Sequence, residues 1–142
     1  MPLDPFDLGR FRLAQDAHGT YGAALAALRA GRKTTHWMWF VFPQIAGLGR
    51  SSTAAHFAIR SLDEARAYLA DDVLGARLLE ASEAAAGAPA ESAVGLLGDV
   101  DAAKLRSSMT LFARTAPEEP VFRRVLERWF DGEEDPATLA RL

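Results

Sequence analysis

The chain has no cysteine among its 142 residues. This absence excludes disulfide bonds, thiolate catalysis and zinc sites built on cysteine. The remaining nitrogen ligands are three histidines, and His18, His36 and His56 show no metal-ligand spacing with one another. We therefore predict no metal site, and no motif in the chain indicates a cofactor.

A strong charge of one sign and a long apolar run are missing as well. The formal net charge is −3, so the protein lacks the basic field that favours nucleic acid, which we do not expect as a partner. No apolar run approaches the roughly 18 residues that span a bilayer. The start of the chain lacks the basic and apolar regions of a signal peptide. We expect a cytoplasmic protein with no membrane partner.

Lysine is scarce, because only Lys33 and Lys104 are lysines among the 16 basic residues. A chain that otherwise uses arginine keeps lysine where a compact ammonium fits and a planar guanidinium does not. Two surface lysines placed by chance would give the same count. Both lysines nevertheless stand at the edge of the least ordinary stretches of the sequence.

What the sequence does contain is a succession of short helical patterns. Asp4-Pro5 predicts a helix start, with Asp4 as the N-cap. Phe11 and Gln15 then fall on an inner face, and Arg10 is expected to point outward. Ser61 opens a capping box, and Gly31 is placed to end the second helix.

The later segments continue in the same way. We expect a helix from about Ala90 to Leu97, another capped by Asp101, and one that ends at Phe130. Hydrophobic residues make up 49% of the chain, which is ordinary for one globular domain. The prediction is an all-α fold: a single compact domain over residues 1–142, with eight or nine short helices and no significant sheet.

The most unusual stretch is residues 33–44. A polar head, residues 33–36, leads into six bulky apolar side chains that include Trp37 and Trp39. Such a run must be buried, and we predict a short helix with Thr34 or Thr35 as its N-cap. The free N–H groups of its first turn could then meet an anion, with His36 as orienting group or general acid/base. The alternative is a buried histidine that bonds to a nearby carbonyl.

Two further segments carry candidate residues. The glycine-rich loop of residues 44–52 holds Gln44, Arg50 and Ser51, and could cradle a phosphate or carboxylate. The segment of residues 104–112 places Lys104, Ser107 and Ser108 on one helical stripe, because residues three and four apart are neighbours. A plain surface loop and close packing between helices are the respective alternatives.

These motifs also carry a resemblance. The chain resembles the domain-of-unknown-function family 1810 of uncharacterised bacterial and fungal proteins, nearly from end to end. The matching residues are Asp4-Pro5-Phe6-Asp7-Leu8, Tyr21 through Gly31, Lys33, His36 through Gln44, Gly47-Leu48-Gly49 with Ser51, and Lys104 through Phe112. The resemblance implies a compact all-α fold and no established activity. Such proteins are sometimes labelled calpastatin, a disordered inhibitor, which does not suit a chain with this packed pattern.

The functional hypothesis is a pocket for an anionic small molecule, such as a nucleotide, an ADP-ribose-like compound or a phosphorylated metabolite. The cationic groups of the pocket would be Lys33, Arg50 and Lys104. Hydrogen bonds would come from His36 and Gln44, a stacking surface from Trp37 or Trp39, and hydroxyls from Ser51, Ser107 and Ser108. If the protein is an enzyme, His36 is the candidate proton carrier, although no nucleophile or acid pair indicates a reaction.

The alternative is a protein–protein interaction module without a small ligand. The tryptophans would then belong to the core, and each polar residue would be satisfied by its nearest backbone or carboxylate neighbour. The two hypotheses differ in whether the cationic and polar residues converge on one cavity.

Overall fold

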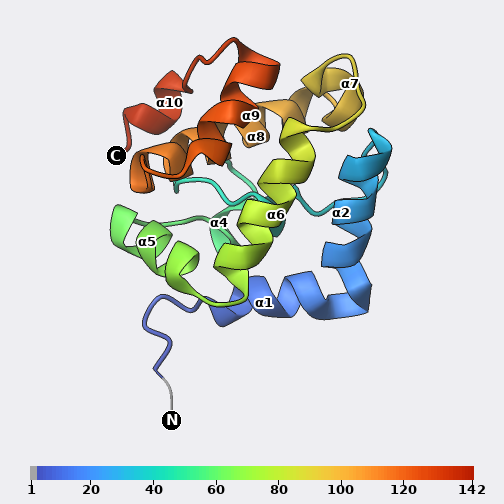
Figure 1. Ribbon diagram of the computed structural model, residues 1–142. Coiled ribbons are helices and arrows are strands. Elements are labelled where there is room, and N and C mark those ends of the chain that lie inside the picture. Colours follow the sequence, from blue (N-terminus) through green and yellow to red (C-terminus); the bar gives the residue numbers. More distant parts are fainter. Residues whose placement is uncertain (1–2) are drawn as a thin grey trace.

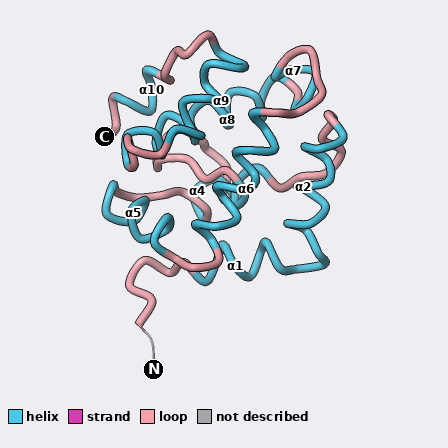
Figure 2. The backbone as a smooth tube through the Cα atoms, viewed as in Figure 1, coloured by secondary structure: helices cyan, strands magenta, loops and turns pink. Residues whose placement is uncertain are grey.

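The computed structural model describes residues 3–142, which form an all-α domain (Figure 1). The helices are α1 Gly9–Asp16, the 3-10 turn η1 Ala17–Gly19, α2 Thr20–Ala30, α3 Met38–Val41, α4 Ser52–His56, α5 Leu62–Ala70, α6 Leu74–Ala86, α7 Ala93–Leu97, α8 Asp99–Thr115, α9 Pro120–Phe130 and α10 Pro136–Leu139. The described residues contain no strand (Figure 2). One isolated parallel bridge joins Ile45 to Ile59. The predicted fold class is confirmed.

The helices surround one apolar core. The two helices α8 and α9 pack on each other, α6 packs on α9, and α5 and α2 flank α6 (Figure 1). The largest fully buried side chains include Trp37, Phe42, Tyr68 and Phe112. None of the helices within residues 3–142 is both long and apolar enough to cross a membrane.

The capping signals of the sequence mostly identify real helix starts. Ser51, Ser61 and Ser92 each accept a hydrogen bond from the backbone N–H three residues on, at the starts of α4, α5 and α7. The expected helix from about Ala90 therefore begins at Ala93 instead. Each of these caps is a contact between near neighbours in sequence, which is why the Ser61 cap could be predicted, whereas the Ser92 cap was not.

The first helix begins later than expected. The helix α1 starts at Gly9, and the Asp4 carboxylate accepts hydrogen bonds from the N–H groups of Leu8 and Gly9, at 2.7 and 2.8 Å. These bonds hold the pKa of Asp4 below its usual value, the one from Gly9 most strongly. Asp4 does satisfy free N–H groups at a helix start, but across a turn and not as the adjacent N-cap.

The expected outward orientation of Arg10 is wrong. Its side chain is buried and pairs with the buried carboxylate of Glu64 at 2.7 Å. The other N–H groups of its guanidinium donate to four backbone carbonyls, those of Phe6, Asp7, His56 and Ala58. The helical pattern places Arg10 beside the inner face. Three acceptors from the distant residues 56–64 and two from the preceding turn then satisfy its charge, which offsets the cost of burial.

A second buried network fixes α3. The Gln15 side-chain N–H₂ donates to the carbonyl of Phe40 at 2.7 Å and to the Tyr68 hydroxyl at 3.1 Å. Burial raises the pKa of Tyr68, so its hydroxyl stays protonated. The last carbonyls of a helix have no partner within the helix, and these bonds satisfy one of them in the core. The network therefore holds the central run against α1 and α5.

Candidate functional site

The polar head of the central run has no regular secondary structure and is not helical. After Gly31 ends α2 as predicted, residues 32–37 cross the end of α7, where the Lys33 N–H donates to the Leu96 carbonyl at 2.8 Å. The helix α3 begins only at Met38, and its N-cap residue Trp37 makes no side-chain cap bond. The prediction of a helix capped by Thr34 or Thr35 is therefore wrong, and a four-residue helix offers no anion site of that kind.

The junction of α7 and α8 forms the opposite wall. Gly98 separates the two helices at φ 86°, a conformation that favours glycine, and α8 then begins at Asp99. The expectation that Asp101 is an N-cap is wrong, because it is the third residue of the helix. Its carboxylate lies in the first turn, where negative charge suits the helix dipole, and is free to bind partners outside the helix.

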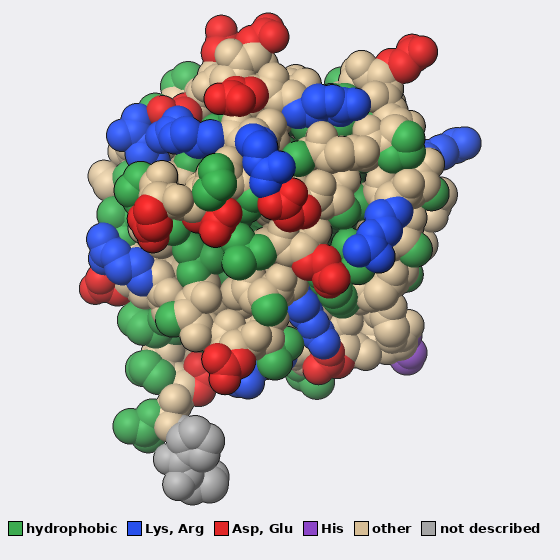
Figure 3. Space-filling view, viewed as in Figure 1, with side chains coloured by type: hydrophobic (Ala, Val, Ile, Leu, Met, Phe, Trp, Pro, Cys, Tyr) green, Lys and Arg blue, Asp and Glu red, His purple; other side chains and the backbone are tan. Residues whose placement is uncertain are grey.

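Those partners are the two lysines of the chain. The Lys33 ammonium lies 2.7 Å from one Asp101 oxygen, and the Lys104 ammonium lies 3.3 Å from the other. The three side chains are only 7%, 16% and 19% exposed, in the order Lys33, Asp101 and Lys104. One carboxylate faces two ammonium groups, so this cluster carries one uncompensated positive charge. Elsewhere, on the face in Figure 3, charges of both signs are interspersed.

Both tryptophans of the central run border this lysine–aspartate cluster. The Lys104 ammonium lies 4.3 Å from the Trp39 ring centroid, and the Lys33 ammonium lies 5.5 Å from that of Trp37, both within cation–π range. Trp37 is fully buried, whereas Trp39 is half-buried and reaches the surface. The predicted role of a stacking surface is therefore open to Trp39 and not to Trp37.

The cluster lines an open cleft of about 490 Å³ between the central run and the start of α8. This volume is in the range of small-molecule sites, and both lysines, both tryptophans and His36 contribute to its walls. The His36 side chain is exposed, so the alternative of a buried, satisfied histidine is wrong. Asp99, also exposed, adds a negative charge at the rim.

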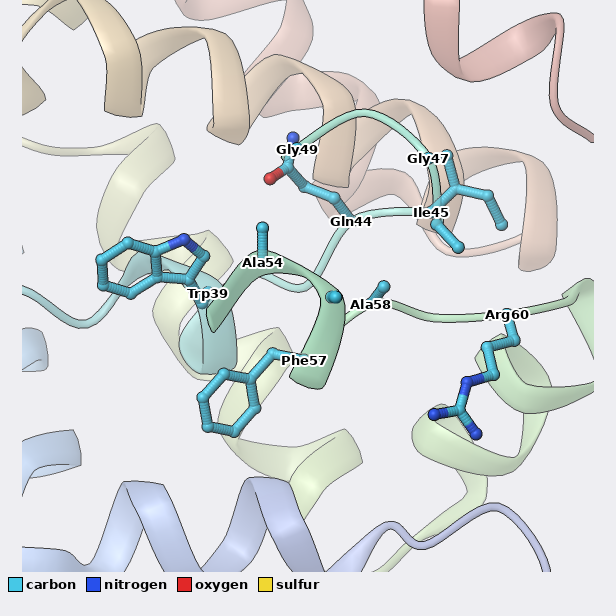
Figure 4. A pocket seen from close by; sticks show the side chains of 11 residues that line it. Trp39, Gln44, Ile45, Gly47, Gly49, Ala54, Phe57, Ala58 and Arg60 are labelled. Atoms are coloured by element: carbon cyan, nitrogen blue, oxygen red, sulfur yellow. The ribbon is translucent and has the colours of Figure 1, made fainter. Parts of the chain in front are cut away.

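Two smaller cavities adjoin this cleft through shared walls. Lys104 also borders a cavity of about 360 Å³ that includes Gln44 and Ser107. Trp39 also borders a cavity of about 260 Å³, which Gln44 shares (Figure 4). In that view the Trp39 ring and Phe57 lie at one end, and Arg60 lies at the other. Most of the predicted site residues thus come together around Lys104 and Trp39.

Three predicted residues do not line these cavities. Arg50 is exposed and has no ion-pair partner in the described part of the chain. Ser51 serves as the cap of α4, and Ser108 is buried in the packing of α8. Ser107, which does line the second cavity, shares a hydrogen bond of 2.7 Å with the Thr138 hydroxyl.

Two buried side-chain polar atoms of residues 3–142 have no hydrogen-bond partner, the Trp37 indole N–H and the Ser108 hydroxyl. Both belong to residues that the sequence singles out. An unsatisfied buried donor costs about 1–3 kcal/mol, so such atoms are rare without a reason. The Trp37 donor is the more informative of the two, because Trp37 is part of the wall of the cleft.

The residue that sequence reasoning missed is Asp101, which holds the two lysines together. Its spacing three residues before Lys104 was the one available signal, since such residues are neighbours on a helix. The contact with Lys33 has no local signal. Within residues 3–142, no group of three His, Asp or Glu side chains could hold a metal ion.

The known proteins that the chain matches agree with this fold, and their descriptions name no activity. Residues 5–142 match the family described as protein of unknown function (DUF1810), and the chain belongs to this family. The structure is similar to the crystal structure of the conserved hypothetical protein Rv1873 from Mycobacterium tuberculosis. The TM-score is 0.94 and the identity 47%, over 98% of each chain. No curated protein matches the chain.

Proposed function

Because membership of this family brings no activity with it, we propose from the geometry that the protein binds an anionic small molecule in the cleft between the central run and α8. The observation that carries the proposal is the pairing of Lys33 and Lys104 with a single carboxylate, Asp101, in the wall of an open cleft. The ligand class is a nucleotide, an ADP-ribose-like compound or a phosphorylated metabolite.

The charge of the cluster supports an anionic ligand. Two ammonium groups with one carboxylate leave one positive charge, held on side chains with little exposure to water. Coulomb attraction is stronger at such a site than on the open surface, because the surrounding dielectric constant is lower. Arginine binds phosphate through two parallel hydrogen bonds, whereas lysine binds it as a point charge. A site built on two lysines therefore suits phosphate without requiring the bidentate geometry.

The tryptophans support a ring-bearing ligand. The half-buried Trp39 presents an aromatic surface beside the Lys104 ammonium, so a ring could stack there while its phosphate meets the lysine. His36, exposed at the cleft, remains the candidate proton carrier, but no nucleophile or acid pair beside it defines a reaction.

Binding is tested by calorimetric titration of the protein with AMP, ADP-ribose, inorganic pyrophosphate and sugar phosphates. The variant Lys104→Gln keeps most of the length of the side chain and removes its charge. We expect it to weaken binding of the recognised anion about tenfold or more, because a hydrogen bond to a charged group contributes about 1.5–3 kcal/mol. Lys33→Gln should act in the same direction.

The matched control is Arg66→Gln, which removes a cation from the exposed surface of α5, where Arg66 pairs only with Asp63. Its binding should equal that of the wild type. Equal losses in Arg66→Gln and Lys104→Gln would mean that net charge alone drives binding. A wild-type protein that binds none of the anions would contradict the proposal.

A second prediction concerns Asp101 itself. Asp101→Asn should tighten pyrophosphate binding about tenfold and steepen its salt dependence, because both ammonium groups then lack a counter-charge. The variant should also melt a few degrees lower, since the two lysines lose a charged acceptor. The measurements are titration at two salt concentrations and thermal unfolding. Asp72→Asn, an exposed aspartate that lines none of the three cavities, is the control. Weaker binding in Asp101→Asn alone would contradict this prediction and would show that Asp101 positions the two lysines for the ligand.

A protein partner remains the alternative proposal. Val94 and Val100 are exposed by 52% and 69%, on α7 and α8 near the cleft. They are two isolated valines, which is ordinary for a protein surface. If none of the tested anions binds, we expect instead a protein partner that covers this end of α8.

A further inference from the structure

The cleft and its two adjoining cavities have several lining residues in common. Lys104 and Val100 belong both to the 490 Å³ cleft and to the 360 Å³ cavity. Trp39 belongs both to the cleft and to the 260 Å³ cavity. Gln44 and Gly49 line both of the smaller cavities. The cavities therefore adjoin one another around the side chains of Lys104 and Trp39.

The smallest cavity has the character of a ring-binding chamber. Its walls include the half-buried rings of Trp39 and Phe57 and the side chains of Ala54 and Ala58 (Figure 4). The Gln44 amide stands at its edge, and within residues 3–142 its donor and acceptor groups make no side-chain hydrogen bond. The Arg60 side chain lies at the far end, so the part beside Trp39 and Phe57 has mostly apolar walls and a single polar side chain, as is typical of sites for flat heterocycles.

The cationic group lines the open cleft and lies against the ring of Trp39, the side chain that the cleft shares with this chamber. The Lys104 ammonium is 4.3 Å from the Trp39 ring centroid and 3.3 Å from Asp101, with Lys33 on the far side of that carboxylate. A ligand that occupies both the chamber and the cleft would therefore pass its middle over Lys104. The middle of such a ligand must therefore be anionic. One end of the ligand must suit the aromatic chamber, and the other end must suit the open cleft.

We infer that the ligand is bipartite: two ring-bearing groups joined by a pyrophosphate, with one ring in the chamber beside Trp39 and Phe57, the pyrophosphate at Lys104, and the second ring in the cleft. This inference rests on the proposed function and deepens it. It makes Gln44 and the chamber the determinants of specificity, and it makes Lys104 the determinant of charge. A ligand with a single ring fills only part of this space.

The test compares NAD⁺, as a probe with two rings and a pyrophosphate, with inorganic pyrophosphate, which has no ring. Ala58→Leu fills the chamber without touching either lysine. NAD⁺ should bind wild type at least about tenfold tighter than pyrophosphate, and the variant should lose that gain, because base stacking on aromatic side chains is worth about tenfold or more per base. Pyrophosphate binding should not change.

The control variant is Ala86→Leu, an equally half-buried alanine that lines a separate cavity on α6. A second measurement does not depend on any variant: the backbone amide shifts of the wild-type protein. A single equivalent of NAD⁺ should shift the amides of Gly47 in the chamber and Gly98 in the cleft, and pyrophosphate should shift Gly98 without Gly47.

The outcomes separate the two proposals. If pyrophosphate binds in a Lys104-dependent way but NAD⁺ binds no tighter, or shifts Gly98 alone, the bipartite ligand is wrong and the anion site stands. Equal weakening of both probes by Ala58→Leu would also overturn the bipartite ligand. If neither probe binds the wild-type protein, both proposals fail.

Discussion

Replacing Arg10 with methionine should lower the free energy of unfolding by about 3–5 kcal/mol, the usual cost of removing one partner of a buried ion pair. The variant leaves the Glu64 carboxylate charged and buried, and it also removes the donors of four backbone carbonyls. Total stabilities are only about 5–15 kcal/mol, so a large part of the stability of the domain depends on this side chain. Urea unfolding followed by circular dichroism measures the change.

The chain offers a matched control two residues away. Arg12 is on the same helix, but its side chain is 43% exposed and lies 3.8 Å from Asp71. Arg12→Met should change stability by less than about 1 kcal/mol, because exposed ion pairs contribute little. The double variant Arg10→Met/Glu64→Leu should be more stable than Arg10→Met, since it leaves no unpaired charge. Equal losses in Arg10→Met and Arg12→Met would refute the role of the buried pair.

The second large effect is expected at Gly75, at the start of α6. A Cβ atom there would lie 2.1 Å from the backbone carbonyl oxygen of Leu69 in α5, too close for either atom to remain in place. Gly75→Ala must push the ends of α5 and α6 apart, and overpacking of this kind costs about 1–3 kcal/mol or more. The measurement is the urea midpoint, compared at equal slope so that only stability is read.

Gly22 is the corresponding control, because it is also helical but a Cβ there would meet no atom within 4 Å. Gly22→Ala should stabilise the protein by about 0.5–1 kcal/mol through the better helix propensity of alanine. The two glycine-to-alanine changes should therefore have opposite signs. Stabilisation by Gly75→Ala would mean that the α5–α6 contact is looser than the structure shows.

The sequence singled out many residues of the candidate site, but it did not show which residue holds them together. It singled out Lys33, Trp39 and Lys104 by their rarity and by the composition around them, and the structure brings these three together at one cleft. It did not predict Asp101 as their common partner. Arg50 looked equivalent to the lysines by composition, yet its loop leaves it exposed and away from the three cavities.

The sequence by itself determined the helical class, the start of α5 at its serine cap, and the burial of the apolar run after His36. These features depend on contacts between residues three or four apart, or on the fact that a block of large apolar side chains must avoid water. Both can be recognised from order and spacing alone, without knowledge of which elements meet.

The tertiary structure alone decided where Arg10, Asp101 and the head of the central run lie. Arg10 is buried because the Glu64 carboxylate and the carbonyls of His56 and Ala58 converge on it. Residues 32–37 are not helical, because Lys33 bonds to α7 and α8 and these bonds replace those of a helix. Partners this distant in sequence meet only when the core has packed, so no local pattern encodes them.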